Sequence, residues 1–80
     1  MAASYEWEVA KSNMRMLRKK ANMKQKDLGK ELGVDRNIIC TYEKGKHVPR
    51  IDYIQKFCVY FGIGIDDLYD PDLIEGVLGL

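Results

Sequence analysis

Apolar and polar positions alternate along the N-terminal part of the chain with the period of an α-helix. The apolar positions follow one another at steps of three and four residues and are Trp7, Ala10, Met14, Leu17 and Ala21. This spacing places them on one helical face, so we predict an amphipathic helix over about residues 4–21. Ser4 is a suitable N-cap, and Asn22 can adopt the left-handed conformation that ends a helix.

A short second helix is predicted at residues 25–32, where Leu28 and Leu32 lie one turn apart. Gly33 follows it as a C-cap. Gly29, in the middle of this helix, costs about 1 kcal/mol relative to alanine. A glycine there indicates that the following helix passes close to the backbone.

The third predicted helix covers residues 36–44, with Asp35 as its N-cap and Gly45 at its end. Its buried face would carry Ile39 and Tyr42. Two short helices joined by a sharp turn form a helix-turn-helix candidate over residues 25–44.

The C-terminal half continues the helical pattern. Apolar residues predict a helix over about residues 51–61, closed by Gly62, and they are Ile51, Ile54, Phe57, Cys58 and Phe61. Asp66 and Asp67 open a short fifth helix, and Pro71 interrupts the chain. The sequence therefore predicts an all-α, compact domain of four or five helices over residues 1–69. An acidic and apolar tail follows at residues 70–80.

The length and the composition limit the classes of protein that fit. Eighty residues allow one small domain, and 46% hydrophobic with 31% charged residues is the composition of a folded chain. No apolar run has the length of a membrane span, and the N-terminus lacks a signal-peptide core, so we expect a soluble, cytoplasmic protein with no membrane partner.

The chain also lacks the residue sets of a metal site or an enzyme. Cys40, Cys58 and the single histidine, His47, make neither a zinc cluster nor a disulfide framework. No catalytic triad, paired carboxylates or glycine-rich phosphate loop is visible. We therefore expect no cofactor, no metal and no enzymatic activity.

The net charge of +1 hides a strong polarity along the chain. From Lys11 to Lys26 seven residues are basic and none is acidic, whereas from Asp66 to Leu80 five are acidic and none is basic. Such a domain can present its basic end to a polyanion and keep its acidic end away. An ordinary solvated helix face explains the basic stretch equally well.

A set of positions between residues 13 and 69 follows a family pattern, and it consists of Met14, Leu17, Arg18, Gln25, Leu28, Gly33, Val34, Ile39, Tyr42, Glu43, Gly45, Pro49, Gly62, Ile63, Asp67 and Leu68. With these positions the chain resembles the lambda repressor/Cro-type (XRE-like) helix-turn-helix family. The resemblance implies a lambda-repressor-like DNA-binding domain whose helix 36–44 enters the major groove of double-stranded DNA.

In this family the exposed face of the recognition helix reads base edges. Carried over by position, the base-reading residues here are Arg36, Asn37, Cys40 and Thr41. Arg36 can bond to guanine and Asn37 to adenine, although Arg36 could instead contact a phosphate. Thr41 and Ile38 could contact a thymine methyl group, but Ile38 could equally pack on the helix at residues 51–61.

The resemblance also implies backbone contacts and one structural ion pair. Lys24, Gln25, Lys46 and His47 would contact DNA phosphates, which positions the protein without reading sequence. Arg18 and Glu43 occupy the positions where relatives form a partly buried ion pair.

Some residues depart from the family pattern. Lys24 stands where a threonine usually caps the second helix, so we expect the start of that helix to be less well defined. Asp35 puts a carboxylate near the phosphates, and Ile38 and Cys40 form few hydrogen bonds with bases. These departures point to weaker or less specific DNA binding.

The function that the resemblance favours is a sequence-specific DNA-binding transcriptional regulator of the repressor type, acting as a homodimer on a pseudo-palindrome. The candidate dimer surface consists of Tyr60, Ile65, Leu68, Tyr69, Leu73, Ile74, Val77, Leu78 and Leu80. The same tail fits a frayed end or a linker. An antitoxin or adaptor module that binds a protein partner is the alternative function.

Overall fold

A computed structural model describes residues 5–73 of the chain, with side chains from Trp7 onward. The described part contains five helices and no strand: α1 (Tyr5–Lys20), α2 (Gln25–Leu32), α3 (Arg36–Glu43), α4 (Ile51–Phe61) and α5 (Ile65–Leu68). The prediction of an all-α domain with four or five helices is confirmed. The predicted cap at Ser4 lies outside the described residues.

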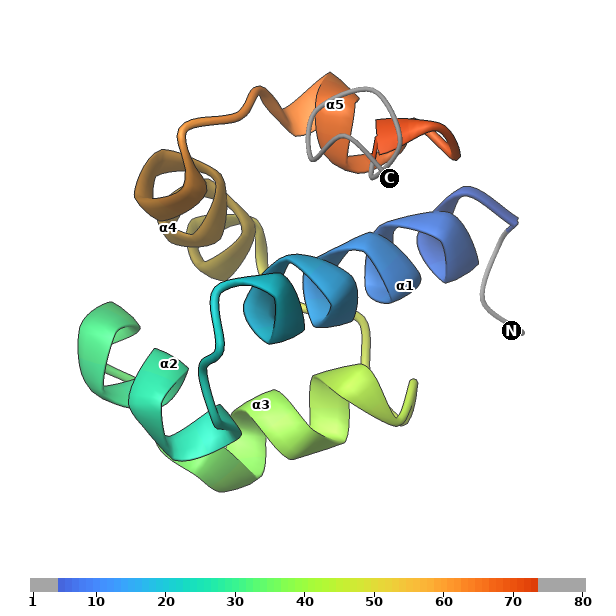
Figure 1. Cartoon of the computed structure of the whole chain (residues 1–80). Helices are drawn as coiled ribbons and strands as arrows, with labels where there is room; N and C mark the ends of the chain where they lie inside the picture. Colours follow the sequence, from blue (N-terminus) through green and yellow to red (C-terminus); the bar gives the residue numbers. More distant parts are fainter. Residues whose placement is uncertain (1–4, 74–80) are drawn as a thin grey trace.

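α1 crosses the middle of the domain, with α2 and α3 on one side of it and α4 and α5 on the other (Figure 1). The core between them is built from the apolar faces of all five helices and the segment after α5. Its buried members are Trp7, Ala10, Met14, Leu17, Leu28, Leu32, Ile39, Tyr53, Ile54, Phe57, Cys58, Leu68 and Leu73. Phe57, Leu28, Ile39 and Leu68 are the largest completely buried side chains.

The prediction for α1 is wrong at its C-terminal end. α1 ends at Lys20, and Ala21 is exposed instead of buried. Asn22 takes the predicted left-handed conformation, with φ of 57°. Ala21 therefore lies in the turn after the helix and not on its buried face.

Two local signals fix the helix-turn-helix. Gly33 takes a φ of 72°, and the Val34 N–H donates to the carbonyl of Gly29 at 2.9 Å, so the left-handed cap ends α2 as predicted. Asp35 caps α3, because its carboxylate accepts a hydrogen bond from the Asn37 N–H at 2.7 Å.

The start of α2 is better defined than the sequence predicted. Lys24 provides no side-chain cap, but the Asp27 carboxylate accepts a hydrogen bond from the Lys24 N–H at 2.9 Å. This contact is the reciprocal half of a capping box, and it satisfies the backbone donor just before the helix.

Gly29 lies where the turn after α2 comes closest to the helix. A Cβ atom at Gly29 would stand 2.5 Å from the carbonyl oxygen of Val34 and 3.5 Å from Ile39 Cδ1. The close approach that the sequence predicted is therefore present, although the nearest atom belongs to the turn and not to α3.

Two assignments of apolar residues are wrong in the C-terminal half. Ile51, the first residue of α4, is 60% exposed, and Tyr53 is buried in its place because the buried stripe runs through Tyr53, Ile54 and Phe57. Leu68 and Leu73 are buried in the core of the single chain, so they are not available as a dimer surface. The other apolar tail residues of that prediction, Ile74, Val77, Leu78 and Leu80, lie outside the described residues.

Candidate nucleic-acid interface

The N-terminal part of α3 presents the residues predicted to read bases. Arg36, Asn37 and Ile38 are exposed, whereas Cys40 and Thr41 are half-buried. The Thr41 hydroxyl donates to the Asn37 carbonyl at 2.8 Å, so its proton is used within the helix. Arg36 and Asn37 are therefore the side chains of this set with donors free to reach a base edge.

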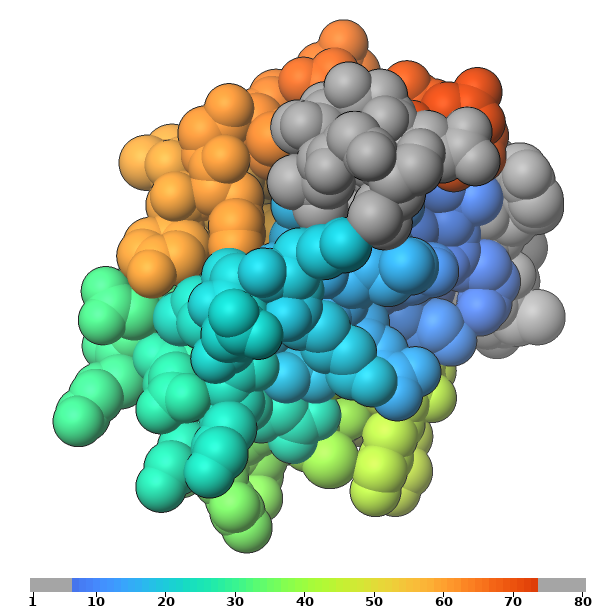
Figure 2. Space-filling model, in the orientation of Figure 1, coloured from blue at the N-terminus to red at the C-terminus, as the bar shows by residue number. Residues whose placement is uncertain are grey.

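The loop after α3 runs beside this helix and widens the surface. Side chains of α3 and of the loop project together at the lower edge of the molecule (Figure 2). Between them lies an open groove of about 400 Å³, lined by Asn37, Ile38, Thr41, Tyr42, His47, Val48 and Arg50. The structure thus places Ile38 toward this loop, whereas the sequence left its packing on α4 as an alternative.

The residues predicted to contact phosphates fall into two groups. Lys24, Lys46 and His47 are exposed, the first just before α2 and the other two in the loop after α3. Gln25 is half-buried, and its amide Nε2 donates to Glu43 Oε1 at 3.1 Å. Gln25 therefore braces α2 against α3, and one of its two amide hydrogens remains for a phosphate.

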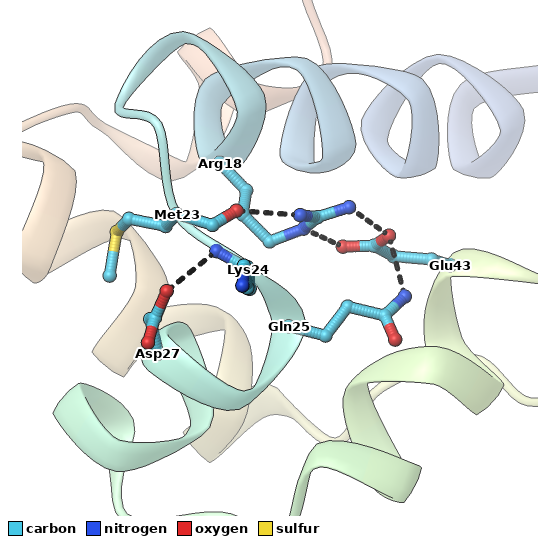
Figure 3. A network of polar contacts seen from close by, with 6 residues as sticks. All are labelled: Arg18, Met23, Lys24, Gln25, Asp27 and Glu43. Carbon is cyan, nitrogen blue, oxygen red and sulfur yellow. Dashed lines mark hydrogen bonds and ion pairs between the residues drawn. The ribbon is translucent and has the colours of Figure 1, made fainter.

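Arg18 and Glu43 meet between α1 and α3, in the network drawn in Figure 3. Arg18 Nε donates to Glu43 Oε2 at 2.7 Å, and Nη2 donates to Oε1 at 2.9 Å. The side chains are 9% and 10% exposed, respectively. The hydrogen bond to Glu43 raises the pKa of the Arg18 guanidinium, so this group stays protonated.

The same guanidinium also holds the connection from α1 to α2. Arg18 Nη1 donates to the carbonyl of Met23 at 2.7 Å (Figure 3). Because Gln25 bonds to the same carboxylate, one ion pair links α1, the start of α2 and the end of α3. This network fixes α3 relative to the rest of the domain, and the exposed face of α3 is presented on a rigid support.

Exposed cationic side chains lie at both ends of α3 and in the groove. Arg36 begins the helix, Lys44 and Lys46 follow its C-terminal end, and Arg50 lines the groove. Asp35 is the acidic residue at the start of α3, and its carboxylate is engaged by the Asn37 N–H. A surface with this charge favours a negatively charged partner over a neutral ligand.

The described residues show neither a metal cluster nor a membrane span. No group of three His, Cys, Asp or Glu side chains in residues 5–73 is placed to hold a metal ion. Among these residues, none of the helices combines the length and the apolar character needed to cross a bilayer.

Comparison with known proteins decides the family. Residues 14–68 match the helix-turn-helix family, and the matched residues span α2, α3 and most of the remaining fold. The chain belongs to this helix-turn-helix family, of the Cro/CI type. Membership in the family places the chain among DNA-binding transcription regulators and not among enzymes.

Relatives of this helix-turn-helix chain include archaeal and phage proteins. The HTH-type transcriptional regulator MJ0272 of Methanocaldococcus jannaschii is 37% identical over 59 residues, which cover 74% of this chain and 89% of the relative. The CTXphi transcriptional repressor RstR from Vibrio cholerae is 30% identical over 57 residues, which cover 71% of this chain and 51% of the relative. The regulator YgzD of Bacillus subtilis is 30% identical over 59 residues, 74% of this chain and 89% of its own. No solved structure matches the chain.

The sequence did not single out Val48 and Arg50 as candidate interface residues. Both line the groove beside α3, and both follow Gly45 in a loop that has no helical periodicity. Their place in the sequence could have indicated these two residues. A short loop that follows α3 directly must stay close to that helix, so its side chains can line the same surface.

Proposed function

We propose that this chain is a sequence-specific DNA-binding repressor that inserts α3 into the major groove. The observation that carries the proposal is the exposed pair Arg36 and Asn37 at the start of a helix that is held from behind by the Arg18–Glu43 ion pair. Arg36 would bond to guanine O6 and N7, and Asn37 to adenine N6 and N7. The relationship to the phage repressor RstR supports repression.

Phosphate contacts would fix the orientation of α3 in the groove. The residues for these contacts lie before and after α3 in the sequence. Lys24 and the free amide hydrogen of Gln25 come before it, and Lys46 and His47 follow it. Contacts of this kind give affinity and register without reading sequence. Half-buried Cys40 and Thr41 would lie against the groove edge through their small side chains.

The protein would act as a homodimer on two half-sites about 34–36 Å apart, because one small module buries too little specific surface alone. The surface for the second copy is the open groove of about 550 Å³ between α2 and α4, lined by Glu31, Leu32, Asp52, Gln55, Lys56, Val59 and Tyr60. Its lining combines acidic and basic side chains with apolar ones. Across a twofold axis, Lys56 of one copy can therefore pair with an acid of the other.

The experiment that tests DNA recognition is selection of bound sites from a random duplex library. We expect a twofold-symmetric motif, and Arg36→Ala should relax one position in each half-site, at a cost of about 1–3 kcal/mol there. Lys46→Ala is the matched control, because it also removes one positive charge but should leave the motif unchanged. Recovery of no motif would contradict the proposal and would favour the adaptor alternative.

The dimer surface is tested separately by the molar mass in solution and on DNA. Val59 lines this groove and is 81% exposed, so Val59→Asp should leave the fold intact and abolish the dimer. Met16→Asp, at an exposed apolar position on α1, is the control. A dimer that survives Val59→Asp would contradict this surface.

A further inference from the structure

The groove beside α3 is lined in part by aliphatic side chains, which form none of the hydrogen bonds proposed above. Ile38 is 42% exposed and Val48 is 60% exposed, although both are large aliphatic side chains. They come from different elements, α3 and the loop after it, and line the same groove. Two aliphatic side chains converging on one exposed hollow make an apolar contact surface in an otherwise polar and cationic region.

Thr41 extends this apolar surface. Its hydroxyl donates to the Asn37 carbonyl at 2.8 Å, so the group has no proton left for a base acceptor. The part of Thr41 best suited to an outside contact is therefore its methyl group. Ile38, Thr41 and Val48 together are called the apolar notch below.

The chemistry of the major groove restricts what can fill such a notch. Base edges there present hydrogen-bond donors and acceptors, and the one apolar group among them is the C5-methyl of a pyrimidine. The notch is continuous with Asn37, which lines the same groove and is proposed to read a base. His47 and Arg50 line the groove as well, and they supply donors suited to the adjacent phosphates.

We propose that the apolar notch binds the C5-methyl group of a pyrimidine, and that Ile38 and Val48 are specificity determinants for that methyl group. The proposal rests on the proposed DNA-binding function. Thymine and 5-methylcytosine both carry this group, so the notch would favour either of them over uracil or cytosine at one position in each half-site.

The test uses a duplex that the wild-type protein binds specifically, so failure of the proposed function would be evident before the test begins. Each thymine of one half-site is replaced in turn by deoxyuridine, which lacks only the methyl group. At one position the dissociation constant should rise about fourfold, the effect of losing one buried methyl group. Specific binding that withstands every such replacement would overturn the proposal and leave the proposed function standing.

Variants of the notch assign the effect to these residues. In Ile38→Ala and Val48→Ala the same thymine-to-uracil replacement should cost less than about twofold, because the partner of the methyl group is gone. Met16→Ala, an exposed apolar residue on α1 outside the groove, should retain the full loss. A full loss in both notch variants would overturn the assignment.

A further arm distinguishes the two sources of the methyl group. At the sensitive position the thymine·adenine pair is replaced by cytosine·guanine, with and without a methyl group on cytosine C5. Tighter binding to the methylated cytosine shows that the notch reads the methyl group on either base and supports the proposal. If methylation gives no gain but the uracil effect persists, the methyl group is read on thymine alone, which supports Ile38 and Val48 as determinants for thymine and overturns the expectation for 5-methylcytosine.

Discussion

The guanidinium of Arg18 and the carboxylate of Glu43 face each other edge to edge, with two hydrogen bonds of 2.7 and 2.9 Å between them. These residues lie 25 positions apart and belong to α1 and α3. The third arm of the guanidinium bonds to the carbonyl of Met23. The pair is thus a polar link between the central helix and α3, the helix proposed to enter the major groove.

Removing one member of this pair should cost more than removing both. Glu43→Ala leaves a buried guanidinium without its carboxylate, so we expect the free energy of unfolding to fall by about 3–5 kcal/mol. The double variant Arg18→Met/Glu43→Ala should recover part of that loss, because no charge remains unpaired. Urea titrations measure both, and equal losses in the two variants would contradict a paired role.

Gly29→Ala should destabilise the domain although alanine favours helices. The new Cβ atom would stand 2.5 Å from the Val34 carbonyl, a backbone atom that cannot move without opening the turn. We expect a net loss of about 1–3 kcal/mol, because overpacking exceeds the gain in helix propensity. Lys30→Ala, at the next and exposed position of α2, is the control; a Gly29→Ala variant that is more stable than wild type would exclude the close approach.

Asn13 holds α5 against α1. Its amide Nδ2 donates to the carbonyls of Leu68 and Asp70, each at 2.8 Å, and its side chain is buried. Asn13→Ala should lower the free energy of unfolding by about 1–3 kcal/mol, since it takes the amide donor from the buried Leu68 carbonyl and leaves the Asp70 carbonyl with the Leu73 N–H alone. Thermal unfolding checks the loss against Ser12→Ala, an exposed neighbour, and similar values for the two variants would refute the role of Asn13.

Tyr53 makes stability sensitive to alkaline pH. Burial, and then the negative charge of Glu43, raise the pKa of the Tyr53 phenol in the folded chain. The unfolded chain therefore loses this proton first, at about pH 10, and stability present below that pH is lost as the pH rises above it. Burial raises the pKa of the Cys58 thiol as well, which adds to the loss.

Tyr53→Phe isolates the contribution of the phenol, because it keeps the ring that packs edge-on against Tyr42 at a centroid distance of 4.8 Å. Between pH 9 and 12, where the unfolded phenol of about pKa 10 titrates, the variant should lose stability less steeply than the wild type. Urea titrations across this range measure the slope, and identical slopes would contradict the prediction.

Lys46→Ala should weaken binding to all duplexes to a similar degree. Lys46 is exposed in the loop after α3, where it would contact a phosphate. Losing one phosphate contact reduces the slope of log K against log salt by about one. Affinity measured over a range of salt concentrations on the selected site and on a random duplex checks this. A loss confined to the selected site would mean that Lys46 reads a base.

The sequence by itself determined the helices of the helix-turn-helix and of α4. The predicted ranges 25–32 and 51–61 agree with Gln25–Leu32 and Ile51–Phe61. The C-terminal ends of these two helices are set by Gly33 and Gly62, which take left-handed conformations. The Asp35 cap likewise needs only atoms two residues away. Signals of this kind are local, so they can be found without knowing where the rest of the chain lies.

Only the tertiary structure decided which apolar residues are buried and which are presented at the surface. Tyr53 is buried and Ile51 is exposed according to how α4 is rotated against the core, and Leu68 and Leu73 fill the single-chain core because α5 folds back onto α1. Similarly, Ile38 and Val48 share one groove only because the loop after α3 returns beside that helix. Each of these outcomes depends on packing between different segments of the chain. The periodicity of apolar residues within one segment does not indicate which other segment packs against it.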